Sequence, residues 1–247
     1  MPKLTTPDQV NLNYTDIGSG RPIVMIHGWP LSGAAFADNA KVLAAAGYRV
    51  ITYDRRGFGQ SGKPRDGYDY DTLAADLDAL LTGLDLHDVV LLGFSMGGGE
   101  VARYLATRGS ERVGAAILSG SICPALCITK DNPDGAMPRE GFQELADACA
   151  ADHAGFVDQF CGWFYSNEQG LTVPEEVRQQ AVEIARQSAP HAAVATILTW
   201  TEDLREDCRR IDVPLLVIHG DGDQNVPLAK SSARMPEYAQ QAQLVVI

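Results

Sequence analysis

The sequence predicts an α/β fold, in which a mostly parallel β-sheet carries helices on both faces and a helical cap is inserted between two of its strands. Short apolar runs alternate with amphipathic helical stretches as far as residue 121. Strands that are apolar along their whole length, alternating with helices, are typical of a parallel sheet covered on both faces. The alternation stops over residues 140–200, where only helical stretches occur, and resumes near residue 215.

The first elements are two strands and a helix. Residues 10–15 alternate apolar and polar side chains, as a half-buried antiparallel strand does, and the glycines of residues 18–20 make the next turn. The apolar run 23–26 is too short for a helix and suits a buried strand. Ser32 is a candidate N-cap for a helix that Gly47 ends.

The remaining elements of this first part follow in the same alternation. They are a strand at 49–53, a helix that Asp71 caps, a strand at 89–92, a helix at 96–108 that ends at Gly109, and a strand at 113–118. We expect the carboxyl ends of the parallel strands to share one edge of the sheet, where open α/β sheets bind ligands.

The predicted cap lies over that edge. Its helical stretches are residues 142–160, 175–187 and 191–200, and strands at 215–218 and 244–247 follow. No linker rich in Pro or Ser separates cap from sheet, so we expect an insertion rather than an independent domain. The predicted division is a first core part at 1–122, a cap at 123–200 and a second core part at 201–247.

The composition predicts a soluble, single-domain protein. Of its 247 residues, 45% are hydrophobic and 21% are charged, which is ordinary globular usage. Acidic residues outnumber basic ones 32 to 20, and a net charge of −12 repels phosphate backbones and anionic lipid. With no export signal and no apolar run of about 18 residues, we expect no nucleic-acid or membrane partner and a cytoplasmic location. The sequence leaves open whether the protein forms a homo-oligomer.

The five cysteines favour neither disulfides nor a metal. Their number is odd and no export signal precedes them, so a disulfide framework is not expected. Cys149, His153 and Cys161 lie near one another in sequence and raise the alternative of zinc. No C-x-x-C pair and no second histidine accompanies them, so we expect no metal site.

The strongest chemical signal is Gly93-Phe94-Ser95-Met96-Gly97, a G-x-S-x-G between a predicted buried strand and a predicted helix. The glycines permit a sharp turn that lifts the Ser95 hydroxyl out of the sheet. The backbone N–H of Met96 opens the next helix and points at a developing oxyanion. We therefore expect Ser95 to be a nucleophile.

A second turn, His27-Gly28-Trp29-Pro30, follows the predicted strand at 23–26. It lies where a second N–H donor to the oxyanion is needed, and Trp29 would supply it while its ring walls the pocket. Pro30 lacks an N–H and restricts the residue before it. For His27 we expect a hydrogen bond within the turn rather than a role as base.

A third signal is the turn His219-Gly220-Asp221-Gly222-Asp223 after the strand at 215–218. A carboxylate late in the chain, after the nucleophile, fits the order Ser, acid, His of a catalytic triad. An Asp in a Gly-rich turn is often only a turn former, and the residues themselves leave Asp221 and Asp223 as alternatives.

With these motifs the sequence resembles the α/β-hydrolases, and within them the cofactor-free haloperoxidase-like esterases, also called perhydrolases. The resemblance covers the whole chain. It rests on the motifs at residues 27–30 (HGWP), 53–59 (YDRRGFG), 93–99 (GFSMGGG) and 219–224 (HGDGDQ). Together these are more specific than G-x-S-x-G alone.

The resemblance implies a serine carboxylic-ester hydrolase of the α/β-hydrolase fold, without metal or haem. It implies Ser95 as nucleophile, Asp223 rather than Asp221 as triad acid, and Trp29 and Met96 as oxyanion-hole donors. Substrates would be esters of small carboxylic acids, with cofactor-free perhydrolysis as a side activity. The expected pocket residues are Trp29, Pro30, Phe94 and Asn225.

The chain departs from the family at two places. Asn225 stands where the family usually has an apolar pocket residue. The family's catalytic histidine follows the last strand, and its spacing projects that histidine about five positions past Ile247. None of the five histidines fits the role, so we expect the 247-residue chain to lack the triad base and to be nearly inactive.

Three other functions are weighed against this one. Residues 57–62 (GFGQSG) match a dinucleotide fingerprint with Asp76 downstream, but no helix opens directly after the loop. A non-catalytic ligand-binding protein would fit the missing base, although Ser95, Asp223 and the oxyanion turn count against it. Amide or lactam hydrolysis uses the same groups and stays open.

Overall fold

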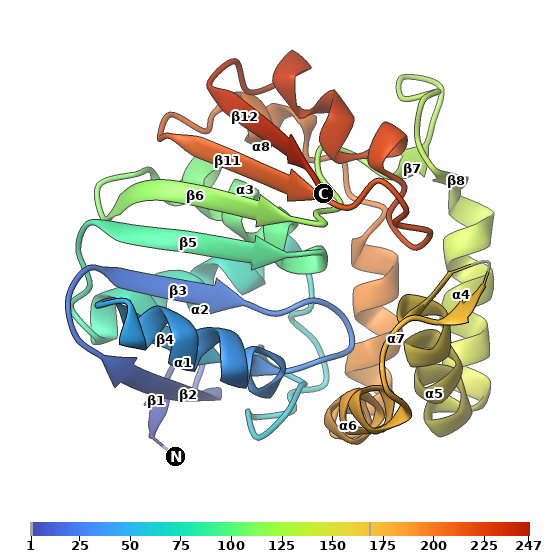
Figure 1. Cartoon of the computed structure of the whole chain (residues 1–247), viewed down its shortest axis with the longest axis horizontal. Coiled ribbons are helices and arrows are strands. Elements are labelled where there is room, and N and C mark those ends of the chain that lie inside the picture. The colour runs from blue at the N-terminus through green and yellow to red at the C-terminus, as the bar shows by residue number, and fades with distance from the viewer. Residues whose placement is uncertain (1, 168) are drawn as a thin grey trace.

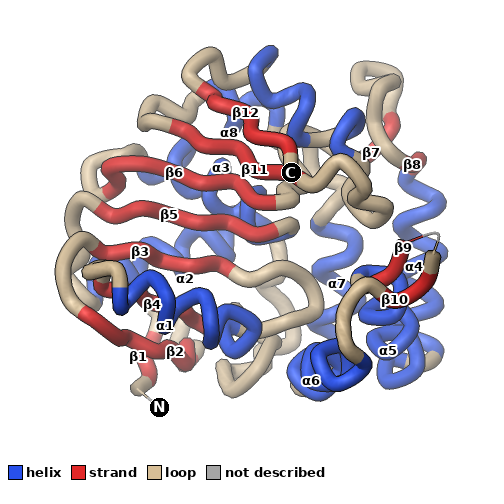
Figure 2. The backbone as a smooth tube through the Cα atoms, viewed as in Figure 1, coloured by secondary structure: helices blue, strands red, loops and turns tan. Residues whose placement is uncertain are grey.

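A computed structural model describes residues 2–167 and 169–247 and is built on one large sheet. Within these residues the sheet has eight strands in the order β1-β2-β4-β3-β5-β6-β11-β12 (Figures 1 and 2). The strands are β1 (Lys3–Thr5), β2 (Asn11–Gly18), β3 (Pro22–Ile26), β4 (Arg49–Tyr53), β5 (Val89–Phe94), β6 (Val113–Ser119), β11 (Leu215–His219) and β12 (Ala242–Val246). β2 pairs antiparallel with β1 and β4, and every other pair is parallel. The predicted α/β sheet is confirmed.

Helices cover the two faces of the sheet unequally. In Figure 1, α2 (Tyr70–Gly83), α3 (Met96–Arg108) and α8 (Arg205–Arg209) lie behind the sheet, and α1 (Ala37–Ala45) lies in front. Leu73, Leu77 and Leu80 of α2 are fully buried, which explains the helical spacing of leucines in the sequence. This rear layer and the strands form the main core.

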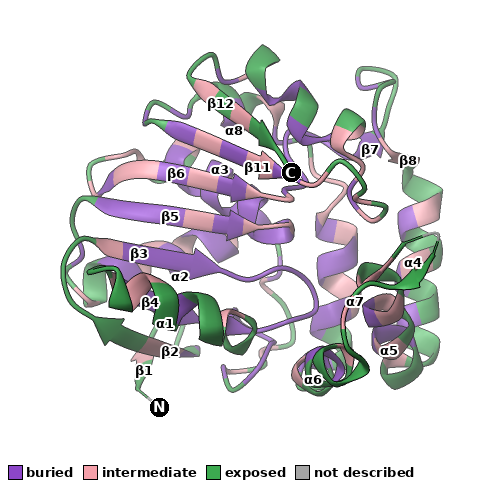
Figure 3. Ribbon diagram, viewed as in Figure 1, coloured by how far each residue is buried: buried purple, intermediate pink, exposed green. Residues whose placement is uncertain are grey.

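The front face is covered only in part. Helix α1 and the 3₁₀ helix η1 (Gly33–Phe36) pack over β4, with Val50 and Ala40 in a small second core. Over β6 and β11 a groove is lined by Ile117 and Leu216, and no described helix lies in front of it in Figure 1. Figure 3 shows that burial falls from β5 toward the end of β12.

In its described residues the cap contains four helices. It lies beyond the carboxyl ends of the parallel strands (Figure 1). The helices are α4 (Arg139–Ala151), α5 (His153–Phe164), α6 (Glu175–Ala185) and α7 (Pro190–Thr199). The other short elements are β7 (Cys127–Ile128), β8 (Met137–Pro138), β9 (Ser166–Asn167), β10 (Gly170–Leu171), η2 (Leu228–Lys230) and η3 (Ser232–Glu237). The cap faces the sheet edge that carries the predicted motifs.

Several local predictions need correction. The helical stretch 142–160 is two helices, because Asp152 leaves the helical conformation and caps α5 by accepting the Gly155 N–H at 3.0 Å. The cap also contains short paired strands, which the sequence analysis did not expect. The N-cap of α2 is Asp69 and not Asp71, since its carboxylate accepts the Thr72 N–H at 2.9 Å.

Strand β1 was not predicted, and three residues are too few for a periodic pattern to be visible. The division at residues 122 and 200 stays a prediction. Among the described helices, none has the length and apolar character required to cross a membrane.

Candidate active site

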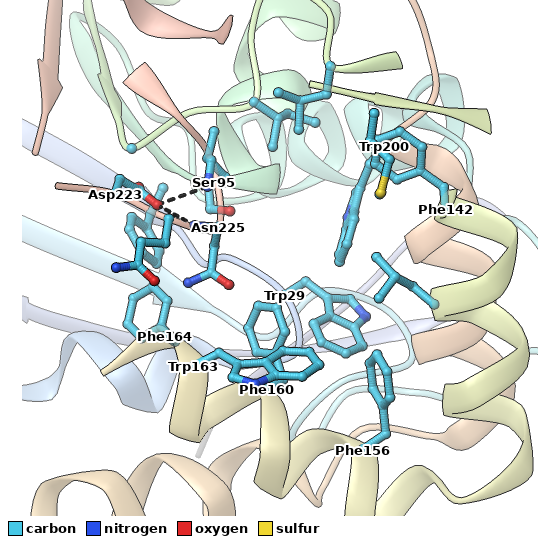
Figure 4. A pocket seen from close by; sticks show the side chains of 18 residues that line it. Trp29, Ser95, Phe142, Phe156, Phe160, Trp163, Phe164, Trp200, Asp223 and Asn225 are labelled. Atoms are coloured by element: carbon cyan, nitrogen blue, oxygen red, sulfur yellow. Dashed lines mark hydrogen bonds between the residues drawn. The ribbon is translucent and has the colours of Figure 1, made fainter. Parts of the chain in front are cut away.

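Ser95 lies at a sharp turn between β5 and α3. Its backbone has φ +52° and ψ −117°, a left-handed region that a side chain normally avoids. The turn is crowded by backbone: a Cβ on Gly97 would lie 2.4 Å from the Ile26 carbonyl oxygen, and one on Gly93 would lie 2.5 Å from the Gly97 oxygen. Only glycines fit at these two positions. Ser95 consequently lies at the sheet edge that faces the cap (Figure 4).

Two backbone N–H groups beside Ser95 have no acceptor. Within the described residues, neither the Trp29 N–H nor the Met96 N–H donates a hydrogen bond. Met96 is the first residue of α3, where the N–H has no partner in the helix. The turn containing Trp29 touches the nucleophile, because a Cβ on Gly28 would lie 3.1 Å from the Ser95 Cβ. Two free donors next to a serine can hold an oxyanion.

Buried hydrogen bonds hold the turn at residues 27–30. His27 accepts the Arg55 N–H at its Nε2 (3.0 Å), and its Nδ1 donates to the Gly28 carbonyl (2.8 Å). The Arg55 guanidinium donates to the His27 carbonyl at 2.9 Å. Complete burial, and then the charge of Arg55, lower the pKa of His27 well below 6.5. The predicted role of His27 within the turn agrees with these bonds.

Arg55 is itself held by a buried ion pair. Its Nε lies 2.9 Å from Glu100 Oε2, both side chains are completely buried, and the Tyr53 hydroxyl donates to the other oxygen of Glu100. Burial raises the pKa of Glu100, and the charge of Arg55 opposes that shift. Glu100 lies in α3, so the pair ties the turn to the helix that follows the nucleophile.

The neighbouring DRRGFG segment is structural. Asp54 accepts the backbone N–H groups of Gly33 (2.9 Å) and Gln60 (2.8 Å), and Arg56 pairs with buried Asp76 at 2.6 Å. Asp76 lies inside α2, and residues 57–69 form no helix. The dinucleotide alternative is therefore wrong, because neither the acid nor the helix is where a dinucleotide requires it.

The loop after β11 carries the candidate acid. Asp223 Oδ1 accepts the N–H groups of Asn225 (2.9 Å) and Val226 (2.8 Å), which fixes its carboxylate (Figure 4). Asp223 lines the same cavity as Ser95, whereas Asp221 is exposed and is not part of that lining. Only Asp223 is therefore placed to act with Ser95.

The cavity has a volume of about 210 Å³ and is lined mainly by apolar residues, eight of which are aromatic. Figure 4 shows Trp29, Phe156, Phe160, Trp163, Phe164 and Trp200 around the space below Ser95. The Trp29 ring is fixed from the cap, since its Nε1 donates to the Ala193 carbonyl at 3.0 Å and Phe160 packs edge-on at 4.8 Å. Phe94 and Asn225 line the cavity, as predicted. Pro30, predicted with them, lies outside that lining, beside Leu31 and Cys161.

The five histidines all lie in the described part of the chain, and none lines this cavity. His87 bonds Asp85, His153 bonds Ser188, and His191 bonds the Pro64 carbonyl. His219 is buried, with its two ring nitrogens 2.7 Å from Ser232 Oγ and 2.8 Å from the Val226 carbonyl.

One contact was not predicted from the sequence. His219 Nε2 lies 3.2 Å from Asp223 Oδ2, so this buried histidine contacts the candidate acid. The signal for this contact in the sequence was the spacing of four residues between His219 and Asp223. The other hydrogen bonds of His219 hold its ring away from Ser95. Among the described residues, no three side chains of His, Cys, Asp or Glu come together as metal ligands.

Comparisons with known proteins agree with this geometry. Residues 21–247 match the family model described as alpha/beta hydrolase fold. A putative non-heme chloroperoxidase of Synechocystis sp. is 44% identical over 240 residues, covering 96% of this chain and 87% of that protein. A bifunctional esterase/perhydrolase of Acinetobacter calcoaceticus is 33% identical, with 98% and 89% covered.

Solved structures give the same result. A bromoperoxidase from Bacillus anthracis superposes with a TM-score of 0.96 at 37% identity, covering 100% of this chain and 90% of that one. An esterase from Exiguobacterium antarcticum superposes at 0.93 with 32% identity, covering 99% and 89%.

Proposed function

Because this chain belongs to the alpha/beta hydrolase fold family, we propose that it is built as a serine esterase that forms an acyl-enzyme with small carboxylic esters. The observation that carries the proposal is Ser95, held at φ +52° beside the unpaired N–H groups of Trp29 and Met96. A ligand-binding protein has no need of such a strained serine between two free donors.

In the proposed reaction, Ser95 Oγ attacks the ester carbonyl and gives its proton to a base. The oxygen becomes an oxyanion, which the Trp29 and Met96 N–H groups stabilise. Collapse breaks the bond to the alcohol, which leaves with the proton from the base. Water then attacks the acyl-enzyme and releases the acid. Hydrogen peroxide in place of water would release a peracid, in keeping with the esterase/perhydrolase relative.

The base must be an imidazole between Ser95 and Asp223. None of the histidines of residues 1–247 lies there, since each is bonded elsewhere. A missing base lowers kcat by about 10⁶, while an oxyanion hole alone keeps on the order of 10³-fold catalysis over water. We therefore expect the 247-residue chain to cleave activated esters slowly and to gain rate from added imidazole.

Labelling with a serine-directed fluorophosphonate in the presence of imidazole tests the nucleophile. The adduct is expected at Ser95 by peptide mass mapping, and Ser95→Ala should abolish it. Ser19→Ala, on the exposed turn after β2, is the matched control and should label like the parent protein. An adduct on another serine, or undiminished labelling of Ser95→Ala, would refute the proposal. Comparing the turnover of an amide and an ester of the same acid shows whether the protein hydrolyses amides as well as esters.

A further inference from the structure

We propose that the Asn225 carboxamide makes this site selective for 2-hydroxy carboxylic esters, whose hydroxyl lies on the carbon next to the scissile carbonyl. The inference rests on the proposed function, because it uses Ser95 and the oxyanion donors to place the substrate. It concerns a side chain that has no part in the reaction itself.

Asn225 carries a carboxamide that has no hydrogen-bond partner among the described residues. Its backbone N–H donates to Asp223 Oδ1 at 2.9 Å, and the next N–H does the same, so the turn fixes the backbone from which this side chain extends. Within residues 2–167 and 169–247, no hydrogen bond is made by its carboxamide. It lines the cavity of Ser95, where most of the other lining residues are apolar.

The reacting atoms determine which part of a substrate meets Asn225. The carbonyl carbon must lie against Ser95 Oγ, with its oxygen toward the Trp29 and Met96 N–H groups. In Figure 4, Asn225 lies between Ser95 and the rings of Phe164 and Trp163. A short group on the carbon next to the carbonyl therefore meets the carboxamide, while the remainder of the acyl part enters the aromatic space.

The substituent next to the scissile carbonyl must be able to hydrogen-bond, because leaving the Asn225 carboxamide without a hydrogen bond costs free energy. An apolar group placed on Asn225 would displace water from its oxygen and nitrogen without replacing the hydrogen bonds. A hydroxyl can donate to Oδ1 or accept from Nδ2. Sites built to bond a hydroxyl reject analogues that lack it much more strongly than apolar pockets reject an extra methyl group.

The size of the cavity limits the acid part of the substrate. The volume of about 210 Å³ is small compared with the roughly 300–1,000 Å³ of typical ligand sites, which favours a compact acid such as a phenyl-substituted one.

Binding of two uncleaved analogues tests the inference without catalysis. Mandelamide and 2-phenylpropanamide carry a hydroxyl and a methyl group at the same carbon. All three tryptophans of the chain line the cavity, so their fluorescence reports binding directly. We expect one enantiomer of mandelamide to bind about 10-fold more tightly than 2-phenylpropanamide, the effect of one good hydrogen bond.

Asn225→Leu should remove the preference for the hydroxyl and the discrimination between mandelamide enantiomers. Gln224→Leu removes the other carboxamide that lines the cavity, from a more exposed residue, and should keep both because the proposal assigns the hydroxyl contact to Asn225 alone. Equal affinity of the parent protein for the two amides, or the same loss in both variants, would overturn the assignment to Asn225. Far-ultraviolet circular dichroism and melting of each variant verify that it is folded.

The two proposals fail in different ways. If the preference is present but Ser95→Ala leaves ester cleavage unchanged, the proposed esterase function is wrong and the binding site stands. If ester cleavage depends on Ser95 but 4-nitrophenyl esters of 2-hydroxypropanoate and 2-methylpropanoate react with equal kcat/KM, the selectivity proposed for Asn225 is wrong.

Discussion

The two sides of the site differ in how they are held. The oxyanion side, at residues 27–30 and 95–96, rests on a completely buried set of hydrogen bonds around Arg55 and Glu100. The acid side is a loop in which Asp223 keeps 25% of its side chain exposed and is fixed mainly by two backbone N–H groups. In the proposed reaction, charge stabilisation would thus rest on the core, whereas proton transfer would depend on a surface loop.

This difference predicts that substitutions on the acid side change rate and substitutions on the oxyanion side change both rate and stability. The reason is burial: an unpaired group in the core cannot be rescued by water, whereas one on the loop can. The following variants test the comparison in order of expected effect.

Asp223→Asn should have the largest effect on rate. Asp-to-Asn exchange at a triad acid costs on the order of 10⁴ in kcat when histidine is the base. Here we expect the imidazole-dependent rate to fall, because a free imidazole is no longer oriented by the carboxylate. The Asn oxygen can still accept the two backbone N–H groups, so the melting temperature should change little. Asp221→Asn is the matched control; a similar loss of rate in it would show that the wrong aspartate has been assigned.

Arg55→Met should have the largest effect on stability. Removing one partner of a buried ion pair costs about 3–5 kcal/mol in the free energy of unfolding, measured by urea denaturation. Arg21→Met at the exposed pair with Asp88 should cost about 1 kcal/mol or less. The double variant Arg55→Met/Glu100→Leu should regain stability but not rate, since nothing then holds the His27 carbonyl. Full recovery of the rate in the double variant would contradict the proposal that Arg55 positions the turn at residues 27–30.

His27 should affect the pH dependence of stability, and this effect should be smaller than that of Arg55→Met. In the unfolded chain this histidine titrates near 6.5, whereas in the folded protein its pKa is lowered well below that value. Unfolding therefore takes up a proton below pH 6.5, and stability falls with decreasing pH by up to about 1.4 kcal/mol per unit. His27→Gln should flatten that slope between pH 7.5 and 5.5. The exposed His87→Gln is the control, and equal slopes in the parent and His27→Gln would contradict the account.

How much was predictable from the sequence depended on how local the signal was. Apolar runs and the G-x-S-x-G turn are patterns within a few residues. They correctly predicted a strand before Ser95 and a helix after it, although the strand ends at Phe94 and not at residue 92. Part of the cavity lining was predicted, but the residues that the cap contributes were not, because they meet Trp29 and Ser95 across long stretches of chain.

The errors have local physical causes. Asp69 and Asp71 are equally good caps by residue type, and only the backbone conformation selects Asp69. His219 was correctly set aside as a base, but its contact with Asp223 depends on the path of the loop after β11. Pro30 adjoins a lining residue in sequence yet its side chain belongs to the space beside Cys161.

We propose that residues 1–247 already hold the nucleophile and the oxyanion donors in place, and that none of their histidines lies where the proton acceptor is needed. Initial rates of 4-nitrophenyl acetate hydrolysis, measured against imidazole concentration for the 247-residue protein and for Ser95→Ala, test it most directly. The Ser95→Ala curve gives the catalysis by imidazole in solution. The account predicts a saturable increase above that curve for the parent protein, at least about 10²-fold below what a tethered histidine would give. Identical curves for the two proteins would contradict it.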